Sequence, residues 1–398
     1  MSNKTLSDAQ RAIIDGAKLD LMEHSPNRIS QDAERRSLAR NFCSDTVTAP
    51  SAEMLKFAMK ATSVGDDVFG WDYCTNALEQ HMAKICGKEA AIFVSSGTMG
   101  NQIALRCLFE RPPYSVVCDH RSHIYKYEAG GAAFHSGAAT IAVVPKDERY
   151  ISLEDVKEHA ITTDDIHYAT TRVIALENTL NGTIHPQSSI LEISRFAREH
   201  RMKMHLDGAR LWHVSVETGL SLEELCKPFD TISLCFSKGL GTPAGSILVG
   251  PSDLITLARR YRKLFGGGMR QTGILSACAA YALNHHIALL PSVHSKAKRL
   301  ADGLSKIGVE ITEPTETCMV WFDPSSVGLT THQIGKRAAQ LEQPIMTFES
   351  NRLVVHIQTS DEAIDDFLNL VQAMAEEHKG GKLRVDGTSR STHYPARL

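Results

Sequence analysis

Short apolar runs alternate with amphipathic helical patterns along most of the chain, beginning at Phe42. Apolar runs of this length between polar or glycine-rich turns are typical of buried strands, whereas apolar positions three and four residues apart indicate helices. The alternation predicts βαβ units, and therefore an α/β fold with a mostly parallel sheet and helices on both faces. The seven expected strands are 90–94, 115–119, 140–144, 171–177, 203–207, 231–236 and 245–249.

Two long helical patterns close this region, and Pro291 marks the expected domain boundary after them. These helical patterns are 252–264 and 272–290. Beyond Pro291, a helix–strand–strand–helix pattern to about His378 predicts a smaller α+β domain. Its expected strands are 318–322 and 352–356. The predicted large domain covers residues 41–290, and the predicted small domain covers residues 291–378.

The two ends of the chain differ from this central region. Residues 1–40 are mostly polar with one amphipathic stretch from Leu6 to Met22, which predicts an arm packed on the body or on a partner subunit. Residues 379–398 carry five Lys or Arg against one Asp and several glycines, which predicts a disordered tail. The last three residues, Ala396-Arg397-Leu398, resemble the small-basic-Leu peroxisomal address. We therefore expect a cytoplasmic protein, with the peroxisome as the alternative.

Composition excludes several function classes. The 398 residues are 42% hydrophobic and 22% charged, which is ordinary for a globular enzyme. A formal net charge of -3 gives no electrostatic case for nucleic acid or an anionic membrane as a partner. No run of 18 apolar residues predicts a membrane span, and the first residues lack the apolar core of a signal peptide. Nine cysteines without C-x-x-C pairs fit free thiols in a reducing compartment better than disulfides or a zinc site.

A lysine and an aspartate at the ends of two expected strands carry the strongest chemical signal. Lys238 follows an apolar run that stops at Ser-Lys-Gly, where a desolvated amine can act as a nucleophile for carbonyls. Asp207 ends the preceding strand, 31 positions upstream. Taken alone, Lys238 reads as a surface lysine and Asp207 as a helix cap. Together they match pyridoxal 5'-phosphate (PLP), which needs a lysine for its aldehyde and a carboxylate for its pyridine nitrogen.

Three further stretches offer possible cofactor contacts. Ser95 to Asn101 follows a strand and opens a helix, which suits a phosphate, although an ordinary strand–helix turn fits equally well. His123 lies at an expected helix start, where an imidazole can stack on a planar ring. His120 and His123 form H-x-x-H without a third ligand at a recognisable spacing, so we expect no metal site. Arg270 follows three glycines and can bind a phosphate or carboxylate; the alternative is a flexible hinge.

With these residues in view, the chain resembles the low-specificity threonine aldolases, a group of β-eliminating lyases among the fold-type-I PLP enzymes. The resemblance covers about Asn41 to His378, and its motifs occur in family order. They are Ser44-Asp45-Thr46-Val47-Thr48, Val64 to Gly70, Ser96 to Asn101, Ser122 to Gly130, Leu176-Glu177-Asn178-Thr179, Asp207-Gly208-Ala209-Arg210, Ser237-Lys238-Gly239-Leu240 and Gly266 to Gln271. So many ordered matches make chance a poor explanation.

The resemblance implies a role for each matching position. It assigns Lys238 to the cofactor aldehyde, Asp207 to the pyridine nitrogen and His123 to ring stacking. The implied phosphate ligands are Gly97, Thr98 and Arg270, and the implied ligands of the substrate carboxylate are Ser44, Arg210 and Arg352. His167 matches a histidine near the substrate hydroxyl. The family is homotetrameric with shared active sites, so we expect a homodimer or homotetramer.

Several positions depart from the usual family residues. They are Phe69-Gly70-Trp71-Asp72-Tyr73 for Tyr-Gly-Glu/Asp-Asp-Pro, Leu180 for a histidine, Leu211-Trp212-His213 for Ile-Phe-Asn, and Cys318 for an asparagine. The implied cofactor contacts are intact, whereas the surroundings of the substrate side chain are altered.

The expected function is therefore PLP-dependent cleavage of L-threonine or L-allo-threonine to glycine and an aldehyde, with His167 or His123 removing the hydroxyl proton. The alternative is an alanine racemase, since the resemblance includes alanine racemases of fungal peptide-metabolite pathways. A catalytically silent binding or scaffold protein is the third possibility, and the retained Lys238 and Asp207 argue against it.

Overall fold

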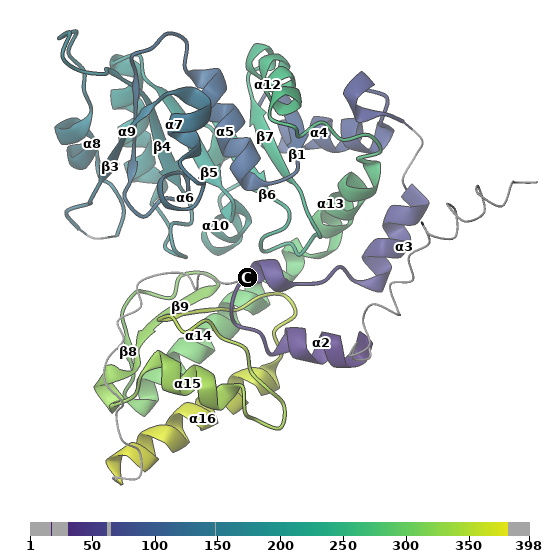
Figure 1. Cartoon of the computed structure of the whole chain (residues 1–398), viewed down its shortest axis with the longest axis vertical. Helices are drawn as coiled ribbons and strands as arrows, with labels where there is room; N and C mark the ends of the chain where they lie inside the picture. Colours follow the sequence, from purple (N-terminus) through teal and green to yellow (C-terminus); the bar gives the residue numbers. More distant parts are fainter. Residues whose placement is uncertain (1–16, 18–30, 62–64, 148, 381–398) are drawn as a thin grey trace, which may run out of the picture.

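The computed structural model describes residues 17, 31–61, 65–147 and 149–380 of the chain. The predicted arm helix, apart from residue 17, and the predicted tail beyond residue 380 lie outside these residues. The described chain forms two units with separate hydrophobic cores, and the smaller unit, green to yellow, lies below the larger one in Figure 1.

The larger unit is built on a seven-stranded sheet with the order β1-β7-β6-β5-β4-β2-β3. Its strands are β1 (Ala90–Val94), β2 (Ser115–Asp119), β3 (Ala139–Val143), β4 (Thr171–Glu177), β5 (Lys203–Gly208), β6 (Thr231–Cys235) and β7 (Ser246–Gly250). Only β7 runs antiparallel to its neighbours, so the predicted mostly parallel sheet is confirmed. Because β4, β5 and β6 are parallel, their carboxyl ends meet at one edge of the sheet.

Helices cover both faces of this sheet (Figure 1). They are α3 (Ala52–Ala61), α4 (Tyr73–Ile85), α5 (Gly97–Leu108), α6 (His123–Lys126), α7 (Gly131–Ser136), α8 (Leu153–His159), α9 (Gln187–Glu199), α10 (Leu211–Thr218), α11 (Leu222–Cys226), α12 (Ser252–Leu264) and α13 (Gly273–His285), with the 3-10 turns η1 (Asp45–Val47) and η2 (Asp67–Phe69). Helix α5 approaches the sheet closely because Gly100 has no side chain: a Cβ there would lie 2.4 Å from Ser233 Oγ on β6.

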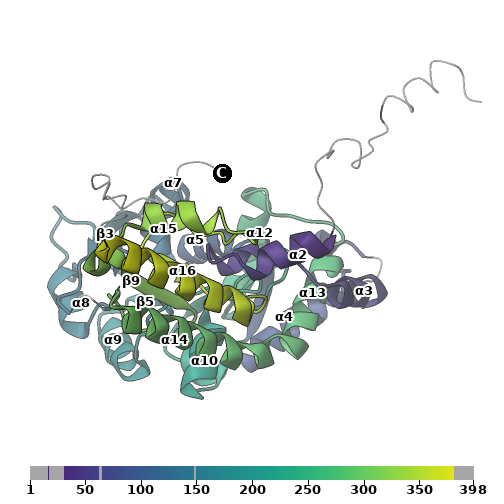
Figure 2. The ribbon, with the colours of Figure 1, turned by 90° about the horizontal axis from the view of Figure 1, so that it is seen from below.

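The smaller unit pairs a three-stranded antiparallel sheet with helices. Its elements are α14 (Leu290–Ile307), β8 (Glu310–Ile311), β9 (Met319–Asp323), η4 (Pro324–Val327), α15 (Thr331–Ala338), β10 (Arg352–Val354) and α16 (Asp361–Lys379). Helices α14 and α16 pack side by side across it (Figure 2). The predicted smaller α+β fold is therefore present, with three elements, β8, η4 and α15, that the sequence pattern did not predict.

The predicted helix over 272–290 is wrong in one respect. Helix α13 ends at His285, the 3-10 turn η3 (Ile287–Leu289) follows, and Pro291 lies in the first turn of α14. Proline fits the first turn of a helix, where its missing N–H has no helical partner to lose. Pro291 therefore starts a helix here. Leu290 belongs to the larger core, and Val293 belongs to the smaller core.

The segment before η1 joins the smaller unit, although it precedes the larger one in sequence. Helix α2 (Gln31–Ala39) leads into Phe42, whose backbone N–H donates to Met346 and whose carbonyl accepts from Val354. The Phe42 ring lies 5.8 Å from the ring of Phe367 on α16, and both side chains are fully buried. This anchoring places the following residues, Ser44 and Asp45, between the two units.

Two other sequence-based expectations can be compared with the described residues. All nine cysteines lie among them and are free thiols, as predicted. No single described helix is long and apolar enough to cross a membrane; one bent pair, 273–285 with 287–307, meets the length and composition criteria only when taken together.

The contact between Phe42 and Phe367 predicts a large loss of stability for Phe367→Ala. Truncating a fully buried phenylalanine costs about 3–5 kcal/mol, because apolar contacts are lost and a cavity remains. We expect the urea midpoint of unfolding, followed by circular dichroism, to fall accordingly. Phe134→Ala is the control, since Phe134 is 85% exposed and should change stability by less than about 0.5 kcal/mol. Equal midpoints for the two variants would contradict the assigned packing.

Candidate functional site

A cavity of about 350 Å³ opens at the carboxyl ends of β5 and β6. Its lining comes from six separate stretches of the chain: Thr46 and Thr48; Ser95 to Thr98 with Asn101; His123; Asp207 and Ala209; Cys235, Ser237 and Lys238; and Thr242 to Ala244. The structure thus brings Lys238, Asp207, His123, Gly97 and Thr98 to one cavity.

Lys238 lies in a tight loop directly after β6. Gly239 and Gly241 have φ angles of 71° and 68°, in the left-handed region that glycine adopts at low cost. The loop turns the chain back toward β7 and leaves Lys238 on the cavity wall. Its side-chain amine has no hydrogen-bond or ion-pair partner among the described residues.

Asp207 is buried at the end of β5 and held by two donors. Its Oδ1 accepts from the backbone N–H of Ala209 at 3.0 Å, and its Oδ2 accepts from Asn101 Nδ2 at 2.7 Å. The Asn101 carbonyl in turn lies 3.0 Å from His205 Nε2. Burial lowers the pKa of His205 to about 4, so the neutral ring donates from Nε2 and fixes the orientation of the Asn101 amide.

His123 belongs to the same network through a second carboxylate. Its Nδ1 lies 2.8 Å from Glu128 Oε1, which also accepts from Asn101 Nδ2. Burial by itself lowers the pKa of His123, but the hydrogen bond to Glu128 and the charge of Asp207 outweigh this effect and raise the pKa. The backbone N–H of His123 donates to Glu177 Oε2 at 2.7 Å. Burial, reinforced by the negative charge of Asp207, raises the pKa of Glu177.

The amino-terminal end of α5 forms another wall of the cavity. Ser96 caps this 12-residue helix, with its hydroxyl accepting from the N–H of Met99 at 3.2 Å. Gly97 is required by packing, since a Cβ there would lie 2.8 Å from Cys235 Sγ. The small residues leave backbone N–H groups and the positive end of the helix dipole facing the cavity, an arrangement that suits an anion.

The three predicted carboxylate ligands gather beside the cavity and do not line it. Arg210 donates from Nε and Nη2 to both oxygens of Asp45, at 2.8 and 2.6 Å. Burial raises the pKa of Asp45, but the charge and hydrogen bonds of Arg210 dominate and hold it well below its usual range. Ser44 caps η1, and Arg352 Nη2 donates to the carbonyl of Cys43 at 3.4 Å.

Two predicted site residues lie away from the cavity. His167 is on an exposed loop between α8 and β4, with its side chain 78% exposed and its Nδ1 2.7 Å from Asp165. Arg270 lies between α12 and α13, with its side chain 57% exposed and paired with Asp66. Within a single chain, neither lines the cavity beside Lys238.

Sequence reasoning gave no role to four residues that shape the site: Asn101, Glu128, Glu177 and Asp45. Each lies inside a motif quoted for the family resemblance, so the motif positions were the available signal. Their roles depend on side-chain contacts with residues distant in sequence, which the motifs do not reveal.

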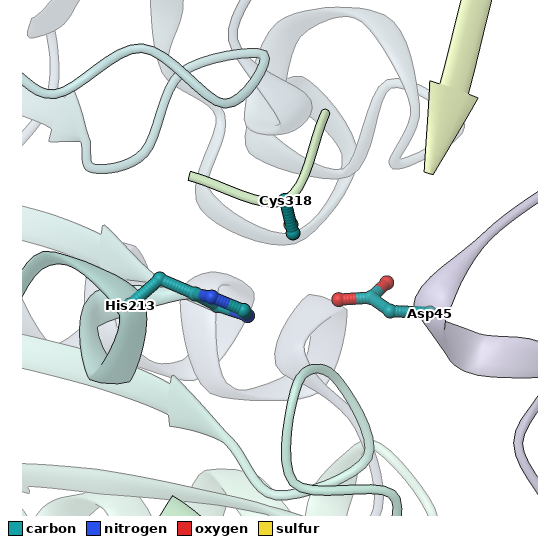
Figure 3. Close-up of side chains that lie close together, drawn as sticks. All are labelled: Asp45, His213 and Cys318. Carbon is teal, nitrogen blue, oxygen red and sulfur yellow. The ribbon is translucent and has the colours of Figure 1, made fainter. Parts of the chain in front are cut away.

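Two clusters of potential metal ligands occur among the described residues. One joins His123, Glu128 and Asp207, and their carboxylates already accept hydrogen bonds from Asn101 and His123. The other joins Asp45, His213 and Cys318, which point toward one another in Figure 3. In this second cluster the guanidinium of Arg210 engages both Asp45 oxygens, and its positive charge disfavours a cation.

Comparison with known proteins gives consistent matches. Residues 41–325 match the family model described as Beta-eliminating lyase. The chain is 38% identical to a low-specificity L-threonine aldolase of Candida albicans over 370 residues, 92% of this chain and 98% of that protein. It is 36% identical to the alanine racemase TOXG of Cochliobolus carbonum over 338 residues, 83% of this chain and 86% of that protein. A solved threonine aldolase structure from Leishmania major shares the fold, with a TM-score of 0.72 at 18% identity, covering 84% of this chain and 99% of that one.

The contact between His123 and Glu128 predicts that Glu128→Gln lowers the pKa of His123. The variant loses the carboxylate that raises the pKa, whereas burial, which lowers it, remains. An NMR titration of the His123 imidazole measures the change. Glu349→Gln is the control, because Glu349 pairs with the exposed His332. An unchanged or higher His123 pKa in Glu128→Gln would contradict the assignment.

The raised pKa of His123 in the folded protein also predicts that the stability of the protein depends on pH. Because the folded pKa of His123 lies above its unfolded value, its protonation stabilises the folded state fully below the unfolded pKa of about 6.5. This contribution is lost as pH rises through the folded pKa. Glu128→Gln should therefore lose more stability on the acidic side of this range than on the basic side, as measured by urea unfolding at several pH values.

Proposed function

Since the chain belongs to the β-eliminating lyase family, we propose that it cleaves β-hydroxy amino acids, L-threonine and L-allo-threonine, to glycine and an aldehyde by PLP-dependent retro-aldol chemistry. The observation that carries the proposal is the meeting of Lys238 and Asp207 in one cavity. The 38% identity to the Candida albicans enzyme over nearly its whole length supports this choice of reaction.

The residues of the cavity fit PLP in size and in chemistry. A volume of about 350 Å³ lies within the usual range for small-molecule sites. Gly97 and Thr98, at the start of α5, would bind the phosphate through backbone N–H groups. The buried carboxylate of Asp207 would pair with the pyridine nitrogen, and the free amine of Lys238 would hold the aldehyde. His123 would stack on the ring.

When bound, PLP supplies an electron sink for the electron pair released at Cα of the amino acid. Residues of the chain would determine how effectively PLP accepts that electron pair. Asp207 would hold a proton on the ring nitrogen, and Asn101 fixes the orientation of the Asp207 carboxylate through a 2.7 Å hydrogen bond. A carboxylate with a fixed orientation needs no reorganisation when charge develops at Cα.

Ser44, Arg210 and Arg352 would bind the substrate carboxylate and so orient the bond to be broken. An arginine offers parallel donors that match a carboxylate, which gives orientation as well as affinity. Arg210 directly precedes α10, and Arg352 begins β10 in the smaller unit. A clamp built from both units would exclude water when substrate binds.

A histidine would remove the proton of the substrate hydroxyl. His123 donates from Nδ1 to Glu128, so its neutral form carries the lone pair on Nε2. It would act directly or through a water molecule. His167 is the second candidate, but its side chain is 78% exposed in a single chain.

We propose that a second copy of the chain completes the site, in a homodimer or homotetramer. Both exposed residues of the predicted site, His167 and Arg270, would then reach the cavity of a neighbouring copy. Their exposure, combined with the roles that the family resemblance gives them, supports this assembly.

Alanine racemisation is the second candidate function. It is favoured by the 36% identity to TOXG and by Leu180, which is 5% exposed and stands where the family usually has a histidine. Leucine there removes an imidazole that could serve a substrate hydroxyl. In that reaction Lys238 would exchange the Cα proton on one face of the substrate, and a histidine or a water molecule would do so on the other.

Product analysis with L-threonine, L-allo-threonine and L-alanine separates the candidates. The PLP-loaded protein should release glycine and acetaldehyde from at least one threonine isomer, measured by amino-acid chromatography and an alcohol dehydrogenase assay. Release of neither product from either isomer would reject the aldolase. D-alanine formed from L-alanine, detected by chiral chromatography, would then support the racemase.

Lys238→Ala should abolish the near-visible absorbance of bound PLP and lower the rate by about 10³-fold or more, because the group that holds the aldehyde is gone. Lys203→Ala is the matched control. Lys203 begins β5, at the opposite end of the strand from Asp207, and its side chain is 55% exposed. Retention of the absorbance in Lys238→Ala would reject the assigned lysine.

A further inference from the structure

A chain of three side chains runs from the surface to the Asp45–Arg210 pair. Glu217 Oε2 lies 2.7 Å from His294 Nδ1, and His294 Nε2 lies 2.8 Å from His213 Nδ1. Glu217 and His213 belong to α10, whereas His294 belongs to α14 of the smaller unit. Both histidines are buried, His213 at 1% exposed and His294 at 3%.

The hydrogen bonds fix the protonation of both rings. The Glu217 carboxylate only accepts, so His294 donates from Nδ1. Burial lowers the pKa of His294 despite Glu217, and it lowers the pKa of His213 to about 3 despite Asp45. Both rings are therefore neutral in the absence of ligand. His294 then accepts at Nε2 from His213 Nδ1–H, which leaves a lone pair on His213 Nε2.

This lone pair has no partner. His213 Nε2 is buried and makes no hydrogen bond to any described residue. The His213 ring points toward Asp45 and Cys318, and the potential ligand atoms of the three residues lie within 4.8 Å of one another (Figure 3). Glu217, His294 and His213 thus hold an imidazole in one tautomer, as a carboxylate does in a hydrolase triad. The lone pair on His213 Nε2 is therefore positioned to accept a proton.

A bound substrate carboxylate would favour protonation of His213. Arg210 neutralises Asp45 while no ligand is present. A second carboxylate on Arg210 leaves two buried negative charges for one guanidinium, which is costly at low dielectric. Among the groups around Asp45, His213 is a neutral imidazole that can accept a proton, and one of its ring nitrogens lies within 4.8 Å of an Asp45 oxygen.

We propose that binding of a substrate carboxylate at Arg210 protonates His213, which then becomes the ion-pair partner of Asp45. The proposal rests on the proposed function, which assigns the substrate carboxylate to Arg210. An N–H bond forms at His213 Nε2, the proton comes from solvent through the cavity, and the added positive charge balances the added carboxylate. His213 is a positioning residue, because it acts on the substrate through Asp45 and Arg210.

The other charged and titratable groups facing this site do not replace His213. They are Lys238 on its loop, Cys235 on β6, Cys318 before β9, Arg352 on β10, His356 after β10, and Lys298 on α14, which pairs with Glu217. Lys238 is committed to the cofactor, and Arg352 is already a cation. Burial raises the pKa of Cys318 to about 12, so its thiol stays neutral.

Propionate binding to the PLP-loaded protein tests whether carboxylate binding at Arg210 is coupled to protonation of His213. Propionate has the carboxylate of the substrate but no amine that could displace Lys238 from the cofactor. Calorimetry in two buffers of different ionisation enthalpy gives the number of protons taken up. We expect proton uptake that is largest near pH 5 and decreases as pH rises through the pKa of His213 in the complex, and an affinity that falls with rising pH, by up to about tenfold per pH unit where uptake is complete.

His213→Asn, which restores the residue usual in the family, should bind propionate without this uptake. His294→Gln should also reduce it, because a glutamine amide can donate to His213 Nδ1 and move the remaining ring proton to Nε2. His185→Gln is the matched control, since His185 is buried with a lowered pKa but its ring contacts Ser189 and Tyr150 instead. Its uptake should equal that of the wild type.

Two results overturn the coupling: equal uptake in His213→Asn and wild type, or propionate binding to the wild type without uptake. Turnover of L-threonine or L-alanine by that same preparation would leave the proposed function standing. Absence of both turnover and propionate binding would overturn the proposed function and the coupling together.

Discussion

The hydrogen bond between Asn101 and Asp207 is the contact on which the rest of the site depends. A buried carboxylate is costly unless donors satisfy it, and Asn101 supplies one to Asp207 and a second to Glu128. The second carboxylate then fixes His123 through its Nδ1. One amide on α5 therefore sets the positions of Asp207 and, through Glu128, of His123, the two side chains proposed to contact the cofactor ring. His205, on β5, prevents that amide from rotating.

This arrangement explains why α5 must lie so close to the sheet. The amide of Asn101 reaches Asp207 only because Gly97 and Gly100 allow α5 to rest on Cys235 and Ser233 of β6. The same approach brings the amino-terminal end of α5 to the cavity. The glycines of the strand–helix turn thus serve the acid network as well as the anion site, and an alanine at either position would disturb both.

Much of the fold could be predicted from the sequence because buried parallel strands are continuous apolar runs. The predicted bounds of β1, β2 and β4 coincide with the structure, and the other strands of the large sheet shift by one residue at one or both ends. The failures have physical causes. Strand β8 has two residues, too few for a pattern, and Pro291 is compatible with starting a helix as well as with ending one.

The meeting of Lys238 and Asp207 was also predictable, since parallel topology brings the ends of adjacent strands together. Contacts between side chains far apart in sequence were not. Arg210 was predicted as a carboxylate ligand, but its pairing with Asp45 joins positions 165 residues apart. Likewise, His167 and Arg270 were assigned by motif, and motif position does not reveal that both are exposed in a single chain.

The ion pair between Asp45 and Arg210 joins the two units. Phe42 anchors the Asp45 segment to β10 and Met346 of the smaller unit, whereas Arg210 belongs to the larger unit. The hydrogen bond from His213 to His294 crosses between the same two units, about one helical turn further along α10. Any relative movement of the units must therefore change both contacts together. The proposed recognition of a substrate carboxylate at Arg210 would for this reason depend on the packing between the two cores, and a substitution in that packing would alter substrate binding without touching the cavity beside Lys238.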